Sequence, residues 1–404
     1  MPKPINPSKS AISVEPAAAR RGARGAKAEP PAMPARAARP AAERKSGVKA
    51  LAKAAAKPNA PPKEVCVAVL AFDGCMGSSV LAPLELFDVA NALTEMISPE
   101  SNTPRFTGRI VSADGQPLTT RRGVHFDAGL VDTAHTDALL VPGIWHNTAR
   151  DLGGTVRSLT AESEILRQHY EAGVMVGAIC SGTALLAETG LLDGREATTS
   201  WWLGEMFRRR YPAVRLSLDK MLTFDSNLWC AGAATAHLNM CLKLIEHFAG
   251  AEIASLVSRW MLIDPNRDSQ APYAMIDLFS TSSDPVVAKA QAWIKTHLGQ
   301  TIELSQVADV AAVSTRTLIR RFHESTGQTP LSYIQKLRVE RAKGLLSTTA
   351  LAVERVMDKS GYSDMSGFRK LFRDHTGLTP HEYRERFRVR GLPRDRAGAA
   401  RPQH

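Results

Sequence analysis

The chain has 404 residues, of which 44% are hydrophobic, with 51 Lys and Arg against 40 Asp and Glu. This length predicts two or three folded domains, and no apolar run reaches the ~20 residues of a membrane-spanning helix. The N-terminus lacks the apolar core of a secretory signal. Five cysteines without a Cys-x-x-Cys pair argue against a disulfide framework and a structural zinc site. We therefore expect a cytoplasmic protein without membrane association, bound metal or cofactor.

The positive charge is concentrated at the two ends of the chain. The net charge is +11 over residues 1–63, −10 over 64–284 and +10 over 285–404. Basic ends around an acidic centre favour nucleic acid binding at the ends. Basic ends that only keep the protein solvated would give the same pattern.

The first 63 residues contain 19 Ala and 11 Pro but no Phe, Trp or Tyr. Such a segment has too little apolar surface to offset the entropy of ordering it, so we predict a disordered N-terminal tail. The tail either contacts DNA phosphates without sequence preference or is passive. Residues 391–404 are predicted to form a second basic tail.

Patterns of alternating strands and helices begin at Glu64. The apolar, β-branched run over 65–72 predicts a strand buried on both faces of a parallel sheet. Further strands are expected at 109–112, 138–141 and 174–180, and helices at 80–93 and 161–171. This alternation predicts an α/β sandwich with a largely parallel sheet, assigned to 64–262. The Ser-, Thr- and Asp-rich segment Ser280–Pro285 indicates a linker, assigned to 263–284.

The strand over 174–180 ends at Cys180, shortly before a helix expected at 183–188. A nucleophile at a sharp strand-to-helix turn, between the small residues Ala178 and Gly182, has the pattern of a nucleophile elbow. The helix N-terminus favours a thiolate there and offers N–H groups to an oxyanion or a carboxylate. A lone cysteine is more often a small core residue, but this context favours a functional site.

The residues around this elbow resemble the GlxA-type members of the class I glutamine-amidotransferase-like (PfpI-like) superfamily. The resemblance covers roughly 64–259 and rests on Ala178–Thr183, Leu185–Arg195, Ala197–Trp201, Val141–Gly143, and Ala82–Phe87 with Asn91. It implies a flavodoxin-like sandwich. The enzymes of the superfamily use the elbow cysteine together with a histidine and a carboxylate.

The sequence departs from those enzymes where the cysteine would be activated. Ser181 follows the cysteine where the proteases have histidine, and Ser200 replaces the histidine common in the GlxA group. Ser78 and Ser79 stand where related sequences often have an acid. Three other histidines lie at no motif position: His125, His146 and His237. Because a nucleophilic thiol needs an oriented base, we predict that Cys180 is a vestigial nucleophile and that the domain is not an enzyme. A cysteine-dependent hydrolase or amidase tethered to DNA is the alternative.

A ligand-binding domain needs only a few aimed polar groups in an apolar cleft. The Cys180 sulfur and the N–H groups of Ser181 and Gly143 would hold an anionic or amide group of a small metabolite. Asp73, Trp145 and Trp201 are further candidates for lining this cleft.

A repeat with an offset of 50 residues occupies the C-terminal part of the chain. The pattern Phe-x-x-x-Thr-Gly-x-Thr-Pro-x-x-Tyr occurs at 322–333 and again at 372–383. Six matching positions in register predict two copies of one supersecondary unit. Each copy has a helix-turn-helix pattern. The expected helices are 304–311 and 315–324 in the first copy, 353–359 and 364–375 in the second, and 330–346 between them.

The second helix of each copy has one apolar and one basic face. In the first copy, Leu318 and Phe322 are expected to be buried, with Arg316 and Arg320 on the opposite face. Guanidinium groups on such a face fit a guanine edge or a phosphate. The alternative is a pair of solvated basic helices in an ordinary bundle, which the paired units and the local charge disfavour.

These patterns resemble the AraC-type DNA-binding domain over Ala288–Phe387. The resemblance rests on Ser314–Phe322, Leu337–Ala342, Leu345–Leu346 and Gly361–Ser363. It implies an all-α domain with two helix-turn-helix units, assigned to 285–390, whose recognition helices enter successive major grooves. The DNA-contacting positions that it implies are Thr315, Arg316, Ile319, Arg320, Met365, Ser366, Arg369 and Lys370.

The two resemblances occur in the order found in GlxA-type AraC-family transcriptional regulators. We therefore predict a bacterial, sequence-specific transcription factor that binds double-stranded DNA at the nucleoid and forms a homodimer. A small-molecule effector would control it by binding one state more tightly than the other. A nucleoid-coating protein with basic ends is a third hypothesis.

Overall fold

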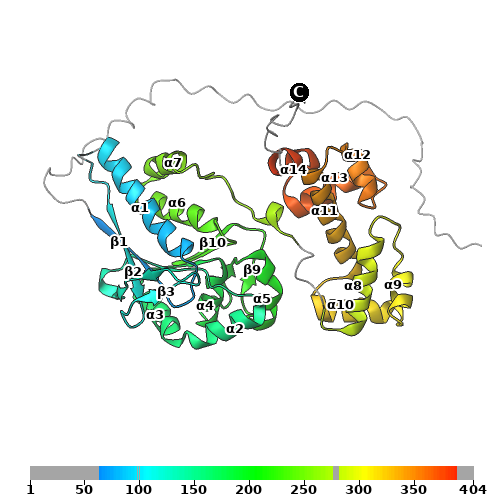
Figure 1. The fold of residues 1–404 in the computed structure, drawn as a ribbon, viewed down its shortest axis with the longest axis horizontal. Coiled ribbons are helices and arrows are strands. Elements are labelled where there is room, and N and C mark those ends of the chain that lie inside the picture. The colour runs from blue at the N-terminus through cyan, green and yellow to red at the C-terminus, as the bar shows by residue number, and fades with distance from the viewer. Residues whose placement is uncertain (1–62, 98, 100, 276–281, 389–404) are drawn as a thin grey trace, which may run out of the picture. The chain divides into compact units, whose positions relative to one another are not determined.

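The computed structural model describes residues 63–97, 99, 101–275 and 282–388 (Figure 1). The predicted C-terminal tail and, except for Lys63, the predicted N-terminal tail lie outside these residues. Among the described residues, no helix has both the length and the apolar character to span a membrane. The folded parts, 63–275 and 282–388, are described separately.

Residues 63–275 form a seven-stranded sheet between two layers of helices. The strand order is β10-β11-β7-β6-β1-β2-β5, and all neighbours are parallel except β10 and β11. The strands are β1 (Glu64–Leu70), β2 (Arg105–Ser112), β5 (Gly129–Leu130), β6 (Ala138–Val141), β7 (Met175–Ile179), β10 (Leu222–Asp225) and β11 (Leu228–Ala231). Every residue of β6 and β7 is buried, as their unbroken apolar sequences require. The predicted α/β sandwich is confirmed.

The helices cover both faces of the sheet (Figure 1). One layer contains α1 (Ser78–Ile97), α6 (Ala236–Ala249) and α7 (Ala251–Trp260), and the other contains α2 (Ala149–Ser158), α3 (Thr160–Glu171), α4 (Thr183–Glu188) and α5 (Gly204–Arg210). The short elements are β3 (Leu118–Thr119), β4 (His125–Phe126), β8 (Glu196–Ala197), β9 (Arg215–Leu216), η1 (Thr133–His135), η2 (Cys180–Gly182), η3 (Trp201–Leu203) and η4 (Ala271–Tyr273).

The predicted elements are present, with shifted ends. The helix expected at 80–93 is α1 and is longer at both ends, while the strand expected at 109–112 begins four residues earlier, at Arg105. Helix α2 and the elements from β8 to α7 were not predicted from the sequence. For α2 a signal was available, because Thr148 and Asp151 form a capping box at its N-terminus.

The interval 263–284, expected to be a linker, begins with residues that pack on the first domain. Gln270 is 1% exposed, and its Nε2 donates to the Thr198 hydroxyl and the Thr199 carbonyl. Backbone hydrogen bonds also join Gln270 to Asp219 and Met221 to Asp268. The first folded part therefore continues through η4.

Residues 282–388 form an all-α domain with two cores. The first core contains residues of α8 (Pro285–His297), α9 (Leu304–Val310) and α10 (Thr315–Thr326), and the second contains residues of α12 (Val353–Lys359), α13 (Met365–Thr376) and α14 (Pro380–Phe387). The long helix α11 (Pro330–Thr348) belongs to both cores, through Tyr333 and Leu337 at one end and Ala342 and Leu346 at the other. The predicted pair of helix-turn-helix units joined by one helix is confirmed.

The repeated sequence forms the same corner in both units. Gly327 ends α10 and Gly377 ends α13, with φ of 69° and 72°, a conformation that glycine adopts without strain. Thr329 and Thr379 then cap the following helices, each of which begins with a proline. The repeated Phe and Tyr are buried in the two cores.

Candidate functional site

Cys180 lies at a sharp turn between β7 and α4. Its φ is +56°, and its side chain is 4% exposed. A Cβ atom at Gly182 would lie 2.4 Å from the carbonyl oxygen of Pro142, so only glycine fits at this position. The turn therefore has the strand-to-helix form of a nucleophile elbow.

The groups around the cysteine are hydroxyls. The Ser200 Oγ lies 2.9 Å from the Cys180 sulfur, and the Thr199 hydroxyl donates to the Cys180 carbonyl oxygen at 2.8 Å. All three residues are buried. A serine hydroxyl does not accept a proton at neutral pH, so Ser200 cannot activate the thiol as a general base.

Two of the histidines considered from the sequence bond to other groups. The Nδ1 of His146 lies 3.0 Å from the carbonyl oxygen of Ile144, and its Nε2 accepts from the Trp202 indole at 3.4 Å. The Nδ1 of His237 lies 2.7 Å from the carbonyl oxygen of Ala234, and burial lowers the pKa of His237.

The structure brings Cys180, Ser181 and Gly143 together, and the Cys180 thiol, the Ser181 hydroxyl and the Gly143 N–H already have protein partners. The Gly143 N–H donates to the Ser79 hydroxyl at 3.0 Å. The Ser181 hydroxyl donates to the Ile144 carbonyl and accepts from the Ile144 N–H. The Gly143 N–H is therefore not free to hold an anion in this conformation.

The remaining ligand candidates lie nearer the surface. Asp73 is exposed and accepts from the Thr119 N–H. Trp145 is 44% exposed, and the Arg121 guanidinium lies 5.9 Å from the centre of its ring. Trp201 is half-buried, with its ring edge-on to that of Trp202.

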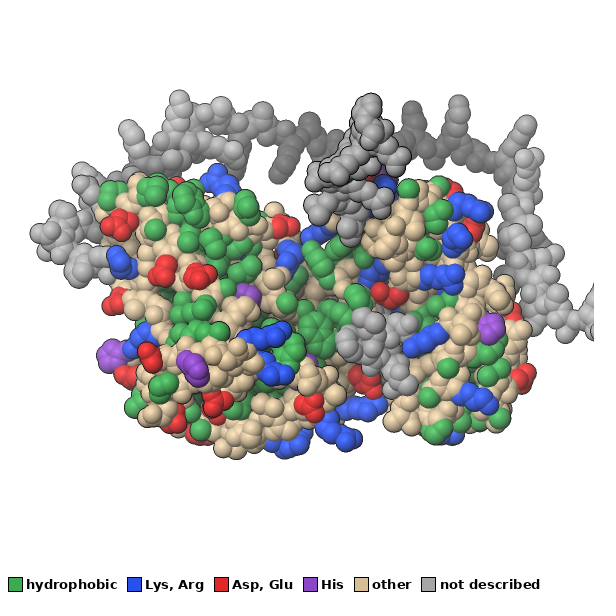
Figure 2. Space-filling view, viewed as in Figure 1, with side chains coloured by type: hydrophobic (Ala, Val, Ile, Leu, Met, Phe, Trp, Pro, Cys, Tyr) green, Lys and Arg blue, Asp and Glu red, His purple; other side chains and the backbone are tan. Residues whose placement is uncertain are grey.

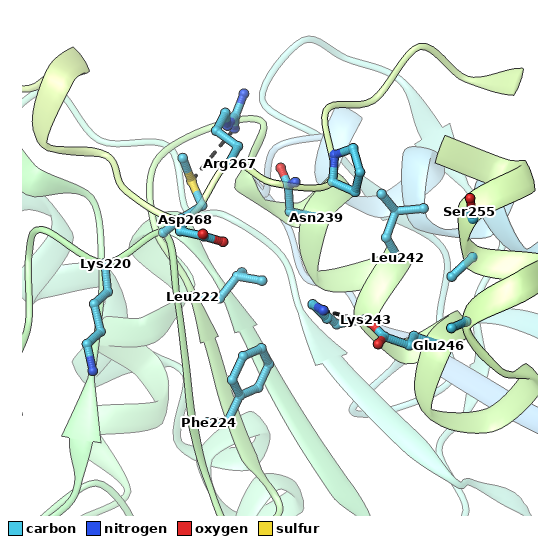
Figure 3. Close-up of a pocket in the computed structure, with 14 residues that line it drawn as sticks. Lys220, Leu222, Phe224, Asn239, Leu242, Lys243, Glu246, Ser255, Arg267 and Asp268 are labelled. Carbon is cyan, nitrogen blue, oxygen red and sulfur yellow. Dashed lines mark hydrogen bonds and ion pairs between the residues drawn. The ribbon is translucent and has the colours of Figure 1, made fainter. Parts of the chain in front are cut away.

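A cavity of about 400 Å³ lies away from the elbow, between β10, α6, α7 and the loop Pro265–Asp268 (Figure 3). The residues predicted as ligand contacts do not line it. Its walls combine apolar side chains such as Leu222, Phe224 and Leu242 with charged ones such as Lys243 and Asp268. This cavity was not predicted from the sequence, because no helix or strand was expected between Trp201 and Ser280.

The second helix of the first helix-turn-helix unit, which the sequence predicts to be its recognition helix, is α10. The Ser314 hydroxyl caps it by accepting from the Thr317 N–H, while Leu318 and Phe322 are fully buried. Arg316 and Arg320 are exposed, as expected for the opposite face. Of the other predicted contacts, Ile319 is 38% exposed and Thr315 is half-buried.

Arg320 already has an anionic neighbour. Its Nη1 lies 3.0 Å from a carboxylate oxygen of Glu324, one turn further along α10. The adjacent Arg321 forms an ion pair with Asp284, the N-cap of α8, at 2.8 Å. Arg321 thus holds α10 against α8, while Arg320 stays at the surface.

The corresponding helix of the second unit is α13, which is capped by Asp364. Phe368 and Phe372 are fully buried. The exposed predicted contacts are Ser366, Arg369 and Lys370, whereas Met365 is half-buried against the second core. Blue Lys and Arg side chains are spread over the face of this domain seen in Figure 2.

Both folded parts of the chain match known protein families. The DJ-1/PfpI family matches residues 65–247, and a helix-turn-helix domain matches residues 307–386. The chain is 26% identical over 334 residues to the HTH-type transcriptional regulator GbdR of Pseudomonas aeruginosa, covering 81% of this chain and 87% of that protein. It is 26% identical over 229 residues to the HTH-type transcriptional regulator GlxA of Rhizobium meliloti, covering 56% of this chain and 70% of that protein.

Among solved structures, a putative transcriptional regulator from Vibrio parahaemolyticus aligns with 49% of this chain and 100% of its own, at 20% identity and a TM-score of 0.42. The sequence matches, the sandwich and the paired helix-turn-helix units lead to one family. The chain belongs to the GlxA-type transcriptional regulators of the AraC family, in which a DJ-1/PfpI domain precedes a DNA-binding helix-turn-helix domain.

Proposed function

We propose that this regulator reads a two-part DNA site, with α10 and α13 each in a major groove. The observation that carries the proposal is that both helices are built alike. Each has a capped N-terminus, two fully buried apolar residues on one face and basic residues on the exposed face. The joining helix α11 has 19 residues and is thus about 28 Å long, comparable to the ~34 Å of one DNA turn.

The exposed side chains divide into two groups by chemistry. Arg316 and Arg320 of α10 are suited to the bidentate contact with guanine that arginine makes in the major groove. On α13, Arg369 and Lys370 supply positive charge, and Ser366 supplies a short hydrogen-bonding group. We assign to α10 the larger share of base reading and to α13 the larger share of phosphate contacts.

The first domain acts as a sensor and not as an enzyme in this proposal. The support is that the hydrogen-bond partner of the Cys180 thiol is a serine hydroxyl, so the thiol lacks an oriented base there. A small-molecule effector that binds one state of the protein more tightly shifts the population towards that state and so changes operator occupancy. Homodimerisation and a cytoplasmic, nucleoid-associated location remain predictions from the sequence.

The test is selection of binding sites by the full-length protein from a random duplex library. We expect enrichment of two half-sites whose centres lie about 10 base pairs apart. Arg316→Ala should remove preference in one half-site, and Lys370→Ala should weaken binding more evenly across sequences. Arg150→Ala, an exposed arginine of the first domain, is the matched control and should leave the selected sequence unchanged.

Two results would contradict the proposal. Binding with no enriched sequence and a uniform loss of affinity with salt would indicate a nucleoid-coating protein instead. A selected site that is unaltered by both Arg316→Ala and Lys370→Ala would show that α10 and α13 are not the reading elements.

A further inference from the structure

We propose that the cavity between β10, α6 and α7 is the effector site of this regulator, and that it takes a small organic cation with an apolar body. This inference rests on the proposed effector control and adds its location and ligand class. The volume of about 400 Å³ lies within the usual range of small-molecule sites. By contrast, Cys180 is buried, and its neighbours bond to one another.

The apolar part of the cavity would accept an aliphatic ligand body. Leu222 and Phe224 project from β10 on one side, and Leu242 projects from α6 on the other (Figure 3). Ala251 and Ala254 of α7 are small, so they leave room beside these larger side chains. The Phe224 ring is 46% exposed, and an aromatic face at a binding site attracts a cation.

The charged residues that line the cavity determine which sign of ligand charge the cavity favours. Lys243 and Glu246 neutralise each other at 2.6 Å. Lys220 forms an ion pair with Glu196 at 2.7 Å, and its side chain points away from the cavity in Figure 3. Neither lysine therefore leaves an uncompensated positive charge facing a ligand.

The remaining charged residues of the lining are Arg267 and Asp268. The Arg267 guanidinium is directed away from the cavity, where it donates to the Thr235 hydroxyl at 2.9 Å and lies 5.6 Å from the centre of the Tyr273 ring. The Asp268 carboxylate points towards the cavity, between Leu222 and Asn239 (Figure 3). An ammonium group beside this carboxylate would form a charge-assisted hydrogen bond.

The wall that carries Asp268 also connects to the elbow. Two residues further on, Gln270 is fixed by hydrogen bonds to Thr198 and Thr199, and Thr199 in turn bonds to the backbone of Cys180. The same segment continues along the chain towards residues 282–388. A ligand that binds the Asp268 carboxylate therefore contacts the segment that leads along the chain to the DNA-binding domain.

The binding test is titration calorimetry on the full-length protein with n-hexylammonium as the probe. The comparison ligands are n-hexanol, which is neutral, and hexanoate, which is an anion. We expect hexylammonium to bind at least about tenfold more tightly than either comparison ligand, because a charge-assisted hydrogen bond contributes a free energy of that size. Asp268→Asn should weaken binding of hexylammonium by a similar factor. Asp219→Asn is the matched control, because Asp219 is exposed on a neighbouring loop and does not line the cavity.

A second variant tests the location independently of charge. Ser255 is an exposed lining residue, so Ser255→Trp should fill the cavity without disturbing the core and abolish binding of the probe. The inference is overturned if hexanoate or hexanol binds as tightly as hexylammonium, or if both Asp268→Asn and Ser255→Trp leave binding of hexylammonium unchanged.

Operator binding separates this inference from the proposed function. Saturating hexylammonium should change the operator affinity of the wild type and of Asp219→Asn but not that of Asp268→Asn. Loss of probe binding in the variants with an unchanged selected DNA site would locate the ligand while leaving DNA reading intact. Failure of site selection in the wild type would refute the proposed DNA reading, whatever the probe does.

Discussion

The Ser200 hydroxyl lies 2.9 Å from the sulfur of Cys180, where the related sequences of the GlxA group commonly have a histidine. This contact makes the elbow part of a buried network that includes the Thr199 hydroxyl and the Gln270 amide. A network of this kind stabilises one arrangement of the segments that it joins. It gives the thiol a hydrogen-bond partner but no base.

Cys180→Ala should leave operator affinity within about twofold of the wild type, because Cys180 is buried and lies outside the helix-turn-helix units. Loss of one buried hydrogen bond should lower the free energy of unfolding by about 1 kcal/mol. Cys241→Ala is the matched control, since Cys241 is also buried but lies on α6. Amide or ester hydrolysis by the wild type that Cys180→Ala abolishes and Cys241→Ala retains would instead establish a cysteine hydrolase.

Gly182→Ala should destabilise the first domain by about 3 kcal/mol or more, the scale of severe overpacking. The added Cβ would lie 2.4 Å from a backbone oxygen, which cannot move away as a flexible side chain can. The control is Gly154→Ala in α2, where no atom lies within 4 Å of an added Cβ. This control should stabilise the protein by about 0.5–1 kcal/mol, as alanine does inside a helix. Urea unfolding measures both, and equal effects would show that the turn at Cys180 is not as tight as described.

Glu324→Gln should strengthen binding to random duplex and reduce the preference for the operator. The Glu324 carboxylate holds Arg320 by an ion pair at 3.0 Å and repels nearby phosphates. Without it, Arg320 is free to bind any phosphate in reach.

Fluorescence anisotropy with operator and random duplex at two salt concentrations measures the ratio of affinities. Glu354→Gln, an exposed carboxylate in the first turn of α12, is the control. A ratio unchanged by Glu324→Gln would show that the ion pair does not orient Arg320 for reading.

The protein should lose stability as the pH falls below about 6.5. Burial lowers the pKa of His169, His237 and His375 below the ordinary value of 6.5, so the unfolded chain binds protons that the folded chain excludes. The free energy of unfolding is therefore highest above pH 7 and decreases on acidification, by at most about 1.4 kcal/mol per pH unit for each histidine.

Urea unfolding between pH 7.5 and 5.5 measures this effect above the range in which most carboxylates titrate. His237→Gln removes one of the titrating groups and should reduce the slope for the first domain. An unchanged slope in that variant would contradict the assignment to His237.

Local sequence patterns determined much of the fold. The unbroken apolar runs of β6 and β7 can only be buried on both faces, so they predict central parallel strands without any knowledge of the rest of the chain. The repeated Phe-Thr-Gly-Thr-Pro-Tyr pattern encodes its own corner, because its glycine ends one helix and its threonine caps the next. These signals depend on neighbouring residues, and they place Arg316 and Lys370 on exposed helix faces before any tertiary contact is known.

The tertiary structure decided what each polar group contacts. The sequence predicted that Cys180, Ser181 and Gly143 lie near one another. Only the fold shows that the Ser79 hydroxyl accepts a hydrogen bond from the Gly143 N–H. The cavity depends on four segments, including β10 and the loop to Asp268, that no local pattern brings together. A helix or a turn is determined by residues a few positions apart, whereas a binding cavity is the space left when distant segments pack. For that reason the sequence predicted the paired helix-turn-helix units, whereas the cavity between β10, α6 and α7 is seen only in the structure.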